Sequence, residues 1–156
     1  MPNADPPVDM SSVCLVDLLS EDVGYGHEAR KLEQEARRYL LSFNWCSGIV
    51  DAYLGDEAAP HFGIFLFLIH PASPNVDRWL WVVVGDLPPA YLVCDDASTP
   101  RKAVQAYISE MSRWVAAVKC GDPIENFIPV NAEPTASNAD LLANRLGLLK
   151  RHYSES

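Results

Sequence analysis

The chain has 156 residues, of which 49% are hydrophobic and 21% are charged, and its formal net charge is −9. This length supports a core without disulfides or metals, and this balance excludes a largely disordered chain. Residues 51–100 hold seven acidic residues and one basic residue. Because nucleic-acid-binding proteins concentrate basic residues on one face, we expect no nucleic-acid partner. A protein partner with a basic surface or a cation fits this charge better, but the favoured interpretation of the charge by itself is that it only aids solubility.

The N-terminal residues 1–10 contain three prolines and lack the basic and apolar regions of a secretory signal. We expect a disordered arm over residues 1–10 and a single domain over residues 11–156. The longest apolar run, residues 62–69, is too short to span a bilayer. We therefore expect a cytoplasmic protein with no membrane partner.

The first regular element is a predicted helix over residues 27–43, after a short apolar run at 13–19 that fits either a strand or a helical turn. In the helix, apolar residues recur at three- and four-residue steps on one face. Glu33 and Arg37 are placed to form a favourable i,i+4 ion pair on its charged side.

Beyond this helix the pattern changes to that of strands. Four apolar runs separated by short turns lie at about residues 49–54, 62–69, 78–84 and 90–94. Connections this short permit antiparallel neighbours but not parallel crossovers. The predicted fold class is therefore α+β, with a central antiparallel four-stranded meander flanked by helices.

The second and third predicted strands are apolar at both alternating sets of positions. An antiparallel sheet with one solvated face alternates apolar and polar residues. We therefore expect both faces of this sheet to be covered, either by helices on two sides or by helices on one side and a partner on the other.

Two further helices are predicted over residues 100–119 and 137–152. Thr99 followed by Pro100 favours the start of the first of them. Ser137 is the expected cap of the second, with Asp140 three residues later as in a capping box. Between them, residues 127–130 fit a short edge strand.

The turn Gly85–Pro89 and the residues after it are the most distinctive local signal. Two consecutive prolines fix φ and remove two donors, so the backbone is stiff and little entropy is lost on binding. Asp86, with Tyr91 beside it, is therefore a candidate binding residue. The alternative is that Asp86 only caps its own turn.

Cys94, Asp95 and Asp96 follow the fourth predicted strand. With His61 or His70 nearby, Cys94 would be a nucleophile activated by an imidazole. Two adjacent carboxylates oppose this, because negative charge raises the pKa of a thiol. A buried thiol followed by two acids at a helix N-terminus is the favoured interpretation, with Asp95, Asp96 and His70 as candidate binding residues.

Trp79 and Trp81 are separated by one residue and are expected on one sheet face, where they either fill the core or anchor a partner. The four cysteines form no CxxC pair, so we expect reduced, mostly buried thiols. The chain also lacks GxGxxG, Walker and GxSxG motifs, and its acidic and histidine residues follow no metal-binding pattern. We expect no cofactor and no metal.

The segment WLWVVVGDLPPAYLV, from Trp79 to Val93, resembles a small bacterial family of unknown function. The resemblance extends to Asn44–Cys46, to the second long helix, to residues 128–131 and to the last helix, and so covers roughly residues 30–150. It implies a compact α+β cytosolic domain and assigns no catalytic residue.

Three hypotheses on function follow. The preferred one is a non-enzymatic protein-binding or regulatory domain, comparable to small acidic regulators and immunity proteins. The second is a small-molecule-binding protein or enzyme with a pocket near residues 85–96, which requires Asp86, Tyr91, Cys94 and His70 to lie together. The third is a homodimeric structural domain whose twin covers one sheet face.

Overall fold

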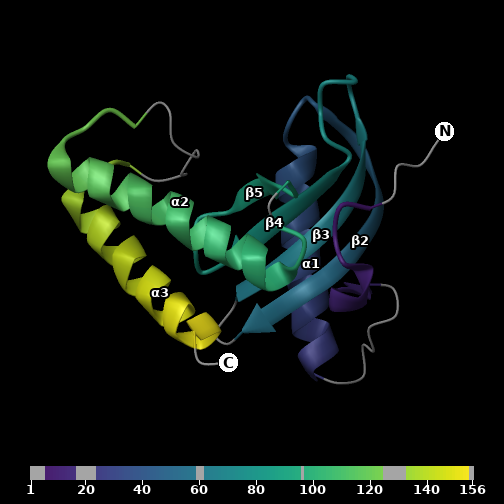
Figure 1. Ribbon diagram of the computed structural model, residues 1–156, viewed down its shortest axis with the longest axis horizontal. Coiled ribbons are helices and arrows are strands. Elements are labelled where there is room, and N and C mark those ends of the chain that lie inside the picture. The colour runs from purple at the N-terminus through teal and green to yellow at the C-terminus, as the bar shows by residue number, and fades with distance from the viewer. Residues whose placement is uncertain (1–5, 17–23, 59–61, 96, 125–132, 155–156) are drawn as a thin grey trace.

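The computed structural model describes residues 6–16, 24–58, 62–95, 97–124 and 133–154. Its elements, in chain order, are the 3-10 helix η1 (Met10–Ser12), β1 (Cys14–Leu15), α1 (Gly24–Leu41), β2 (Cys46–Ala58), β3 (Phe62–Pro71), β4 (Trp79–Gly85), β5 (Ala90–Val93), α2 (Pro100–Cys120) and α3 (Ala136–Ser154) (Figure 1). The predicted α+β class, with an antiparallel sheet flanked by three α-helices, is confirmed within these residues.

Within the described residues the sheet has five antiparallel strands in the order β1-β2-β3-β4-β5, one more than predicted. In the additional strand, β1, Cys14 pairs with Leu54 and Leu15 pairs with Tyr53. The apolar run at 13–19 therefore begins as an edge strand, and residues 17–19 lie outside the described part. A two-residue strand carries too little periodicity to be recognised from sequence.

β2 is longer than the predicted strand over residues 49–54. Its pairing with β3 contains register shifts at positions 46–48, 49–51 and 54–56. A bulge interrupts the two-residue alternation by which a strand is recognised in a sequence. The ends of β2 consequently carry no clear strand pattern.

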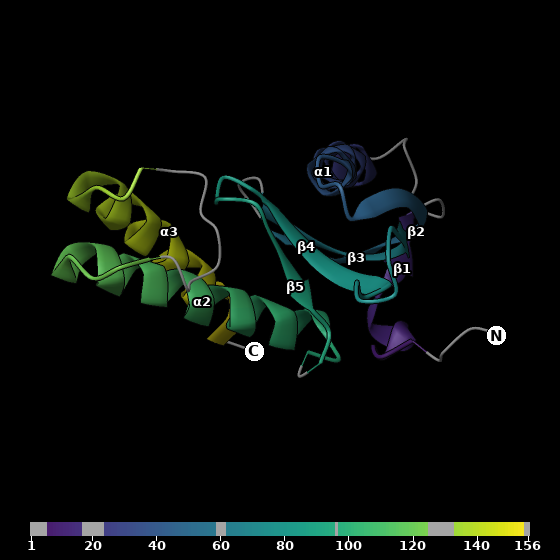
Figure 2. The same ribbon diagram turned by 90° about the horizontal axis from the view of Figure 1, so that it is seen from above.

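Helices cover both faces of the sheet, as the two-sided apolarity of its central strands predicts. α1 lies over one face, and the pair α2 and α3 lies over the other (Figure 2). The buried residues accordingly form two cores. The α1 core includes Phe65, Phe67, Ile69, Leu80, Val82 and Val84, and the α2–α3 core includes Ile64, Leu66, Trp81, Val83, Tyr107 and Leu146. The ion pair predicted on α1 is present, with Arg37 Nη2 2.8 Å from Glu33 Oε2.

α2 and α3 form an antiparallel pair, and part of it extends past the sheet in both views (Figures 1 and 2). α2 begins as predicted, with the Thr99 side chain accepting a hydrogen bond from the Lys102 N–H. It ends at Gly121, which adopts the left-handed conformation with a φ of 74°. The C-terminal end of α2 and the N-terminal end of α3 are joined by an ion pair of 2.6 Å between Lys119 Nζ and Asp140 Oδ1.

The start of α3 corrects the predicted cap. The Asn138 N–H donates to Thr135 Oγ1 at 3.1 Å, so Thr135 caps the helix and Ser137 lies in its first turn. Both Thr135 and Ser137 stand in a run of small polar residues, and local sequence did not distinguish them. The predicted edge strand over residues 127–130 lies outside the described part of the chain.

Residues 6–10 pack onto this framework. Val8 is buried in the α2–α3 core, and the Asp9 N–H donates to the Ser98 carbonyl at 2.8 Å. This part of the predicted arm is therefore attached to the segment that precedes α2. Residues 1–5 lie outside the described residues.

Candidate functional site

A pocket of about 660 Å³ opens on the same sheet face as α2 and α3, toward the end of the sheet where β3 turns into β4. We call it the sheet pocket. Tyr53, Leu68 and Trp79 form its apolar wall, and His70, Asp77 and Asp95 bring polar groups to it. Cys94 and Arg78 also line it, and Pro6 and Pro7 close one side.

The apolar wall is an aromatic pair held by strand register. Tyr53 on β2 pairs with Leu66 on β3, and Trp79 on β4 pairs with Leu68. The two rings stand on one face, with centroids 6.2 Å apart and ring planes at 33°. Both side chains are partly exposed, so their rings are available to a ligand.

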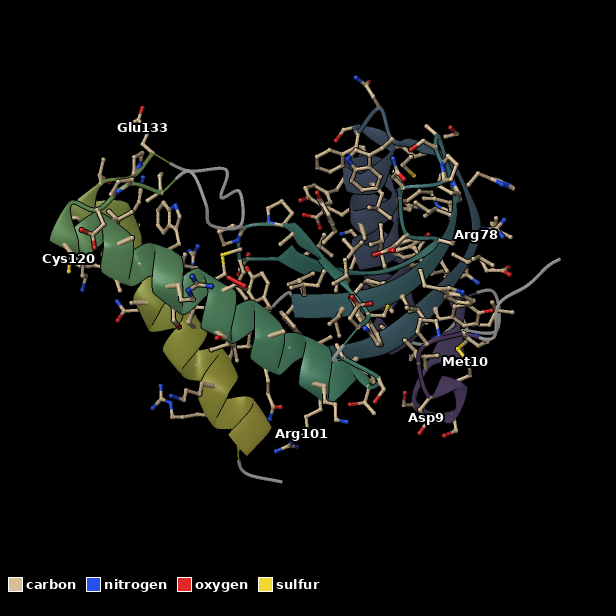
Figure 3. The ribbon with its side chains drawn as sticks, turned by 45° about the horizontal axis from the view of Figure 1, so that its top comes forward. Asp9, Met10, Arg78, Arg101, Cys120 and Glu133 are labelled. Atoms are coloured by element: carbon tan, nitrogen blue, oxygen red, sulfur yellow. The ribbon has the colours of Figure 1, made fainter. Side chains whose placement is uncertain are left out.

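Two carboxylates, Asp77 and Asp95, bring negative charge to the sheet pocket. The charges of Asp77 and Asp95, after the larger effect of burial, raise the pKa of Cys94 to about 12. Burial and then the charge of Asp51 raise the pKa of Tyr53. Two groups in or beside the pocket are thus held in their neutral forms by burial and by nearby negative charge. Arg78, labelled in Figure 3, brings one basic group to the same pocket.

Cys94 has the environment of a structural thiol. It is 5% exposed, and its Sγ donates to the Trp79 carbonyl at 3.5 Å. A pKa of about 12 leaves the sulfur protonated near neutral pH, and the thiolate is the nucleophilic form. Although His70 lines the same pocket, the geometry favours the buried-thiol interpretation over a Cys–His nucleophile.

The structure separates the residues that sequence reasoning placed near the turn. His70, Trp79 and Asp95 meet in the sheet pocket. Asp86 and Tyr91 do not line it. The hypothesis that required Asp86, Tyr91, Cys94 and His70 in one pocket is therefore wrong in that form.

Tyr91 lies on the opposite face of the sheet. It pairs with Val82, which belongs to the α1 core. Its ring packs edge-on against Phe43 and Trp45, with centroid distances of 5.3 and 4.9 Å. Residues that pair across two strands point to the same face of the sheet. The pairing of β5 with β4 after the turn therefore sets the face on which Tyr91 lies.

The turn itself is docked through its backbone. Leu87 is buried, and Tyr107 Oη on α2 donates to the Pro88 carbonyl at 2.7 Å. Gly85 has a φ of 128°, a region that side-chain-bearing residues rarely adopt. Asp86 is exposed between these anchors.

Trp81 and Asp96 complete the candidate residues. Trp81 shares a sheet face with Trp79 as predicted, but it is fully buried and its indole N–H donates to the Ala97 carbonyl at 2.9 Å. It is a core residue. Asp96 lies outside the described residues.

Sequence reasoning missed Tyr53 and Arg78 as pocket residues. Tyr53 and Trp79 lie on the two strands that flank β3, and they meet because of the register of both strands with β3. No local sequence pattern predicts this contact between distant segments. Of the cysteines, Cys46 and Cys94 are buried whereas Cys14 and Cys120 are exposed, so the prediction of mostly buried thiols holds for half of them.

Within the described residues, no three His, Cys, Asp or Glu side chains are grouped so that they could hold a metal ion. No helix in this part of the chain has the length and apolarity to cross a membrane. Comparison with family models, with curated proteins and with solved structures finds no match. The family resemblance of residues 79–93 therefore stays a prediction.

Proposed function

We propose that this chain is a non-catalytic protein-binding domain that receives a basic side chain of its partner in the sheet pocket. The observation that carries the proposal is the Tyr53–Trp79 ring pair with Asp77 and Asp95 in the same pocket. A guanidinium or ammonium group over an aromatic face gains about 0.5–2 kcal/mol. Carboxylates beside it add charge-assisted hydrogen bonds.

An arginine side chain suits this arrangement best. Its guanidinium is planar, so it stacks on Tyr53 or Trp79 while its N–H groups donate to a carboxylate. Arg78, which belongs to this chain and lines the pocket, offsets part of the negative charge of the pocket. A volume of about 660 Å³ is that of a small-ligand site, large enough for the basic side chain and its flanking residues.

The proposal continues the preferred sequence hypothesis. A small acidic domain of this kind regulates a partner by covering a basic surface, as immunity proteins cover the proteins that they neutralise. A cytoplasmic location is part of this proposal. The raised pKa of the Cys94 thiol supports a role without covalent catalysis.

The test is a titration of the isotope-labelled domain, followed by amide and indole NMR shifts, with three probes. These are an arginine-containing hexapeptide, the same peptide with glutamine in place of arginine, and free N-acetylarginine amide. We expect saturable shifts at Trp79 and Asp95 with the arginine peptide, and none with the glutamine peptide. Equal affinity for N-acetylarginine amide would favour the small-molecule hypothesis instead.

Variants locate the site. Asp77→Asn combined with Asp95→Asn should weaken binding of the arginine peptide about tenfold, equivalent to about 1.4 kcal/mol. Asp86→Asn is the matched control, because Asp86 is exposed but lies outside the pocket. An equal loss with Asp86→Asn would move the site to the turn and refute the proposal. Sedimentation that shows a stable dimer at micromolar concentration would favour the homodimer hypothesis.

A further inference from the structure

A second concave surface lies along α2 and at its seam with α3, and among the described residues it shares no lining residue with the sheet pocket. It consists of two adjoining hollows of about 780 and 210 Å³ that have Ile108, Ser112 and Lys150 in common. We call this surface the helix groove. The smaller hollow lies at the seam between the two antiparallel helices, and the larger one runs along α2, with Lys150 its one described lining residue from α3.

The helix groove combines an apolar floor with a basic rim. Ile108 on α2 lies in the floor of both hollows, and Val115 on α2 with Ala143 and Leu146 on α3 completes the floor of the smaller one. The rim carries Arg101, Arg113 and Lys150, and among the described residues that line the groove none is acidic.

The basic groups are spread along the groove. Arg101, labelled in Figure 3, lies near the start of α2, and Arg113 is twelve residues further on. Twelve residues correspond to about 18 Å along a helix axis. Arg113 also contacts Glu110 on its own helix at 3.3 Å, but that pair is exposed and exposed ion pairs are weak.

We propose that the helix groove docks an acidic amphipathic helix of a partner protein. A third helix fits the seam between two packed helices because its side-chain ridge enters their groove. Its apolar residues, spaced as in other helix-in-groove complexes, would contact the floor. Its carboxylates, about three turns apart, would meet the arginines at the two ends.

A second copy of this chain does not supply such a helix from its described part. α1 has three acidic and four basic residues, and α2 and α3 together have two acidic and seven basic residues. The acidic helix therefore belongs to another protein. This interface is independent of the proposed arginine site, since the two surfaces lie on different residues and carry opposite charges.

Gly147 offers a way to block the groove. A Cβ added at Gly147 meets nothing within 4 Å, and Gly147 lines the smaller hollow. Gly147→Leu should therefore fill the groove while the helix is retained, because leucine is the better helix former. Lys150→Glu reverses the rim charge without adding bulk, so it tests the same surface if the leucine variant is poorly folded.

The experiment uses two fluorescein-labelled 21-residue peptides with leucine at helical spacing, one flanked by glutamate and the other by lysine. We expect the glutamate peptide to bind the full chain saturably in an anisotropy titration, and the lysine peptide to bind at least about tenfold more weakly. Gly147→Leu and Lys150→Glu should each weaken glutamate-peptide binding by about tenfold. Arg145→Glu, on an exposed part of α3 outside the groove, should change it less than twofold.

The inference would be overturned by equal binding of both peptides, by no saturation by the glutamate peptide below about 1 mM, or by an equal loss with Arg145→Glu. Self-association that Gly147→Leu abolishes would assign the groove to a second copy and also overturn it. The Asp77→Asn, Asp95→Asn variant should leave glutamate-peptide binding unchanged, so failure of the arginine site and failure of the groove are distinguishable.

Discussion

The sheet pocket and the helix groove show opposite chemistry in one small chain. Residues 1–99 carry 15 acidic and 5 basic residues, whereas residues 100–156 carry 6 acidic and 7 basic ones. The pocket accordingly sets carboxylates beside an aromatic pair, and the groove sets basic residues beside an aliphatic floor. The net charge of −9 agrees with the acidic pocket but gives no sign of the basic groove. Net charge alone therefore predicts a basic partner and misses an acidic one.

The two surfaces also differ in how they are built. The pocket collects side chains from three strands, from the loop between β3 and β4, from the segment after β5 and from residues 6–7, so strand register and long-range packing create it. The groove uses two helices that follow each other in the chain. A change in the register between the strands would separate the residues that line the pocket, whereas the groove, which is built on two helices, would be retained.

The largest expected difference is in thiol reactivity between Cys94 in the pocket and Cys120 at the end of α2. At pH 8, a pKa of about 12 leaves about one Cys94 thiol in ten thousand ionised, and Cys94 is also buried. Cys120 is exposed, so we expect iodoacetamide to label it at least about 100-fold faster. Peptide mapping of the labelled native protein measures both rates. Comparable labelling rates for Cys94 and Cys120 would mean that the pocket activates the Cys94 thiol. That result would favour the enzyme hypothesis.

The next difference separates two tryptophans on one strand. Trp81→Ala removes a fully buried ring and should lower the free energy of unfolding by about 3–5 kcal/mol. Trp79→Ala should lower it by less, because Trp79 is partly exposed, yet should abolish arginine-peptide binding. Urea unfolding, with peptide titration of the folded variants, compares them. If Trp79→Ala cost as much stability as Trp81→Ala, Trp79 would be a core residue without a binding role.

Charge reversal at one surface should weaken the peptide that binds there and leave binding at the other surface unchanged. In the double variant Asp77→Lys, Asp95→Lys, binding of the arginine peptide should fall by about tenfold or more, with no effect on the glutamate peptide. Lys150→Glu should have the reverse effects. Raising the salt concentration from 50 to 500 mM should weaken both complexes, since exposed charges are screened. A variant that weakened both peptides equally would indicate a global change in fold.

The smallest expected effects come from two glycines of the helix pair. Gly147→Ala should raise the free energy of unfolding by about 0.5–1 kcal/mol, because it lies in the interior of α3 with open space around it. Gly121→Ala should lower it by about 1 kcal/mol, because Gly121 has a φ of 74°. Thermal unfolding by circular dichroism gives both. Equal signs for the two variants would contradict the assigned helix end.

Local sequence patterns determined the helices, the order of the four longer strands and the need to cover both sheet faces. The periods of 3.6 and 2 residues are local properties of the chain, so residues 27–43, 62–69 and 78–84 were predicted close to their observed elements. Where local signals were weak or interrupted, prediction failed. β1 is too short to show a period, and bulges obscure the ends of β2.

Tertiary structure alone decided which candidate residues share a site. Trp79 and Tyr91 both stand in the segment with the most distinctive sequence, yet they lie on opposite faces, because the register after Gly85–Pro89 pairs Tyr91 with Val82. Tyr53 joins Trp79 across an intervening strand. Such placements depend on register between strands and on packing between layers, which are properties of pairs of distant segments. A one-residue slip would reverse them.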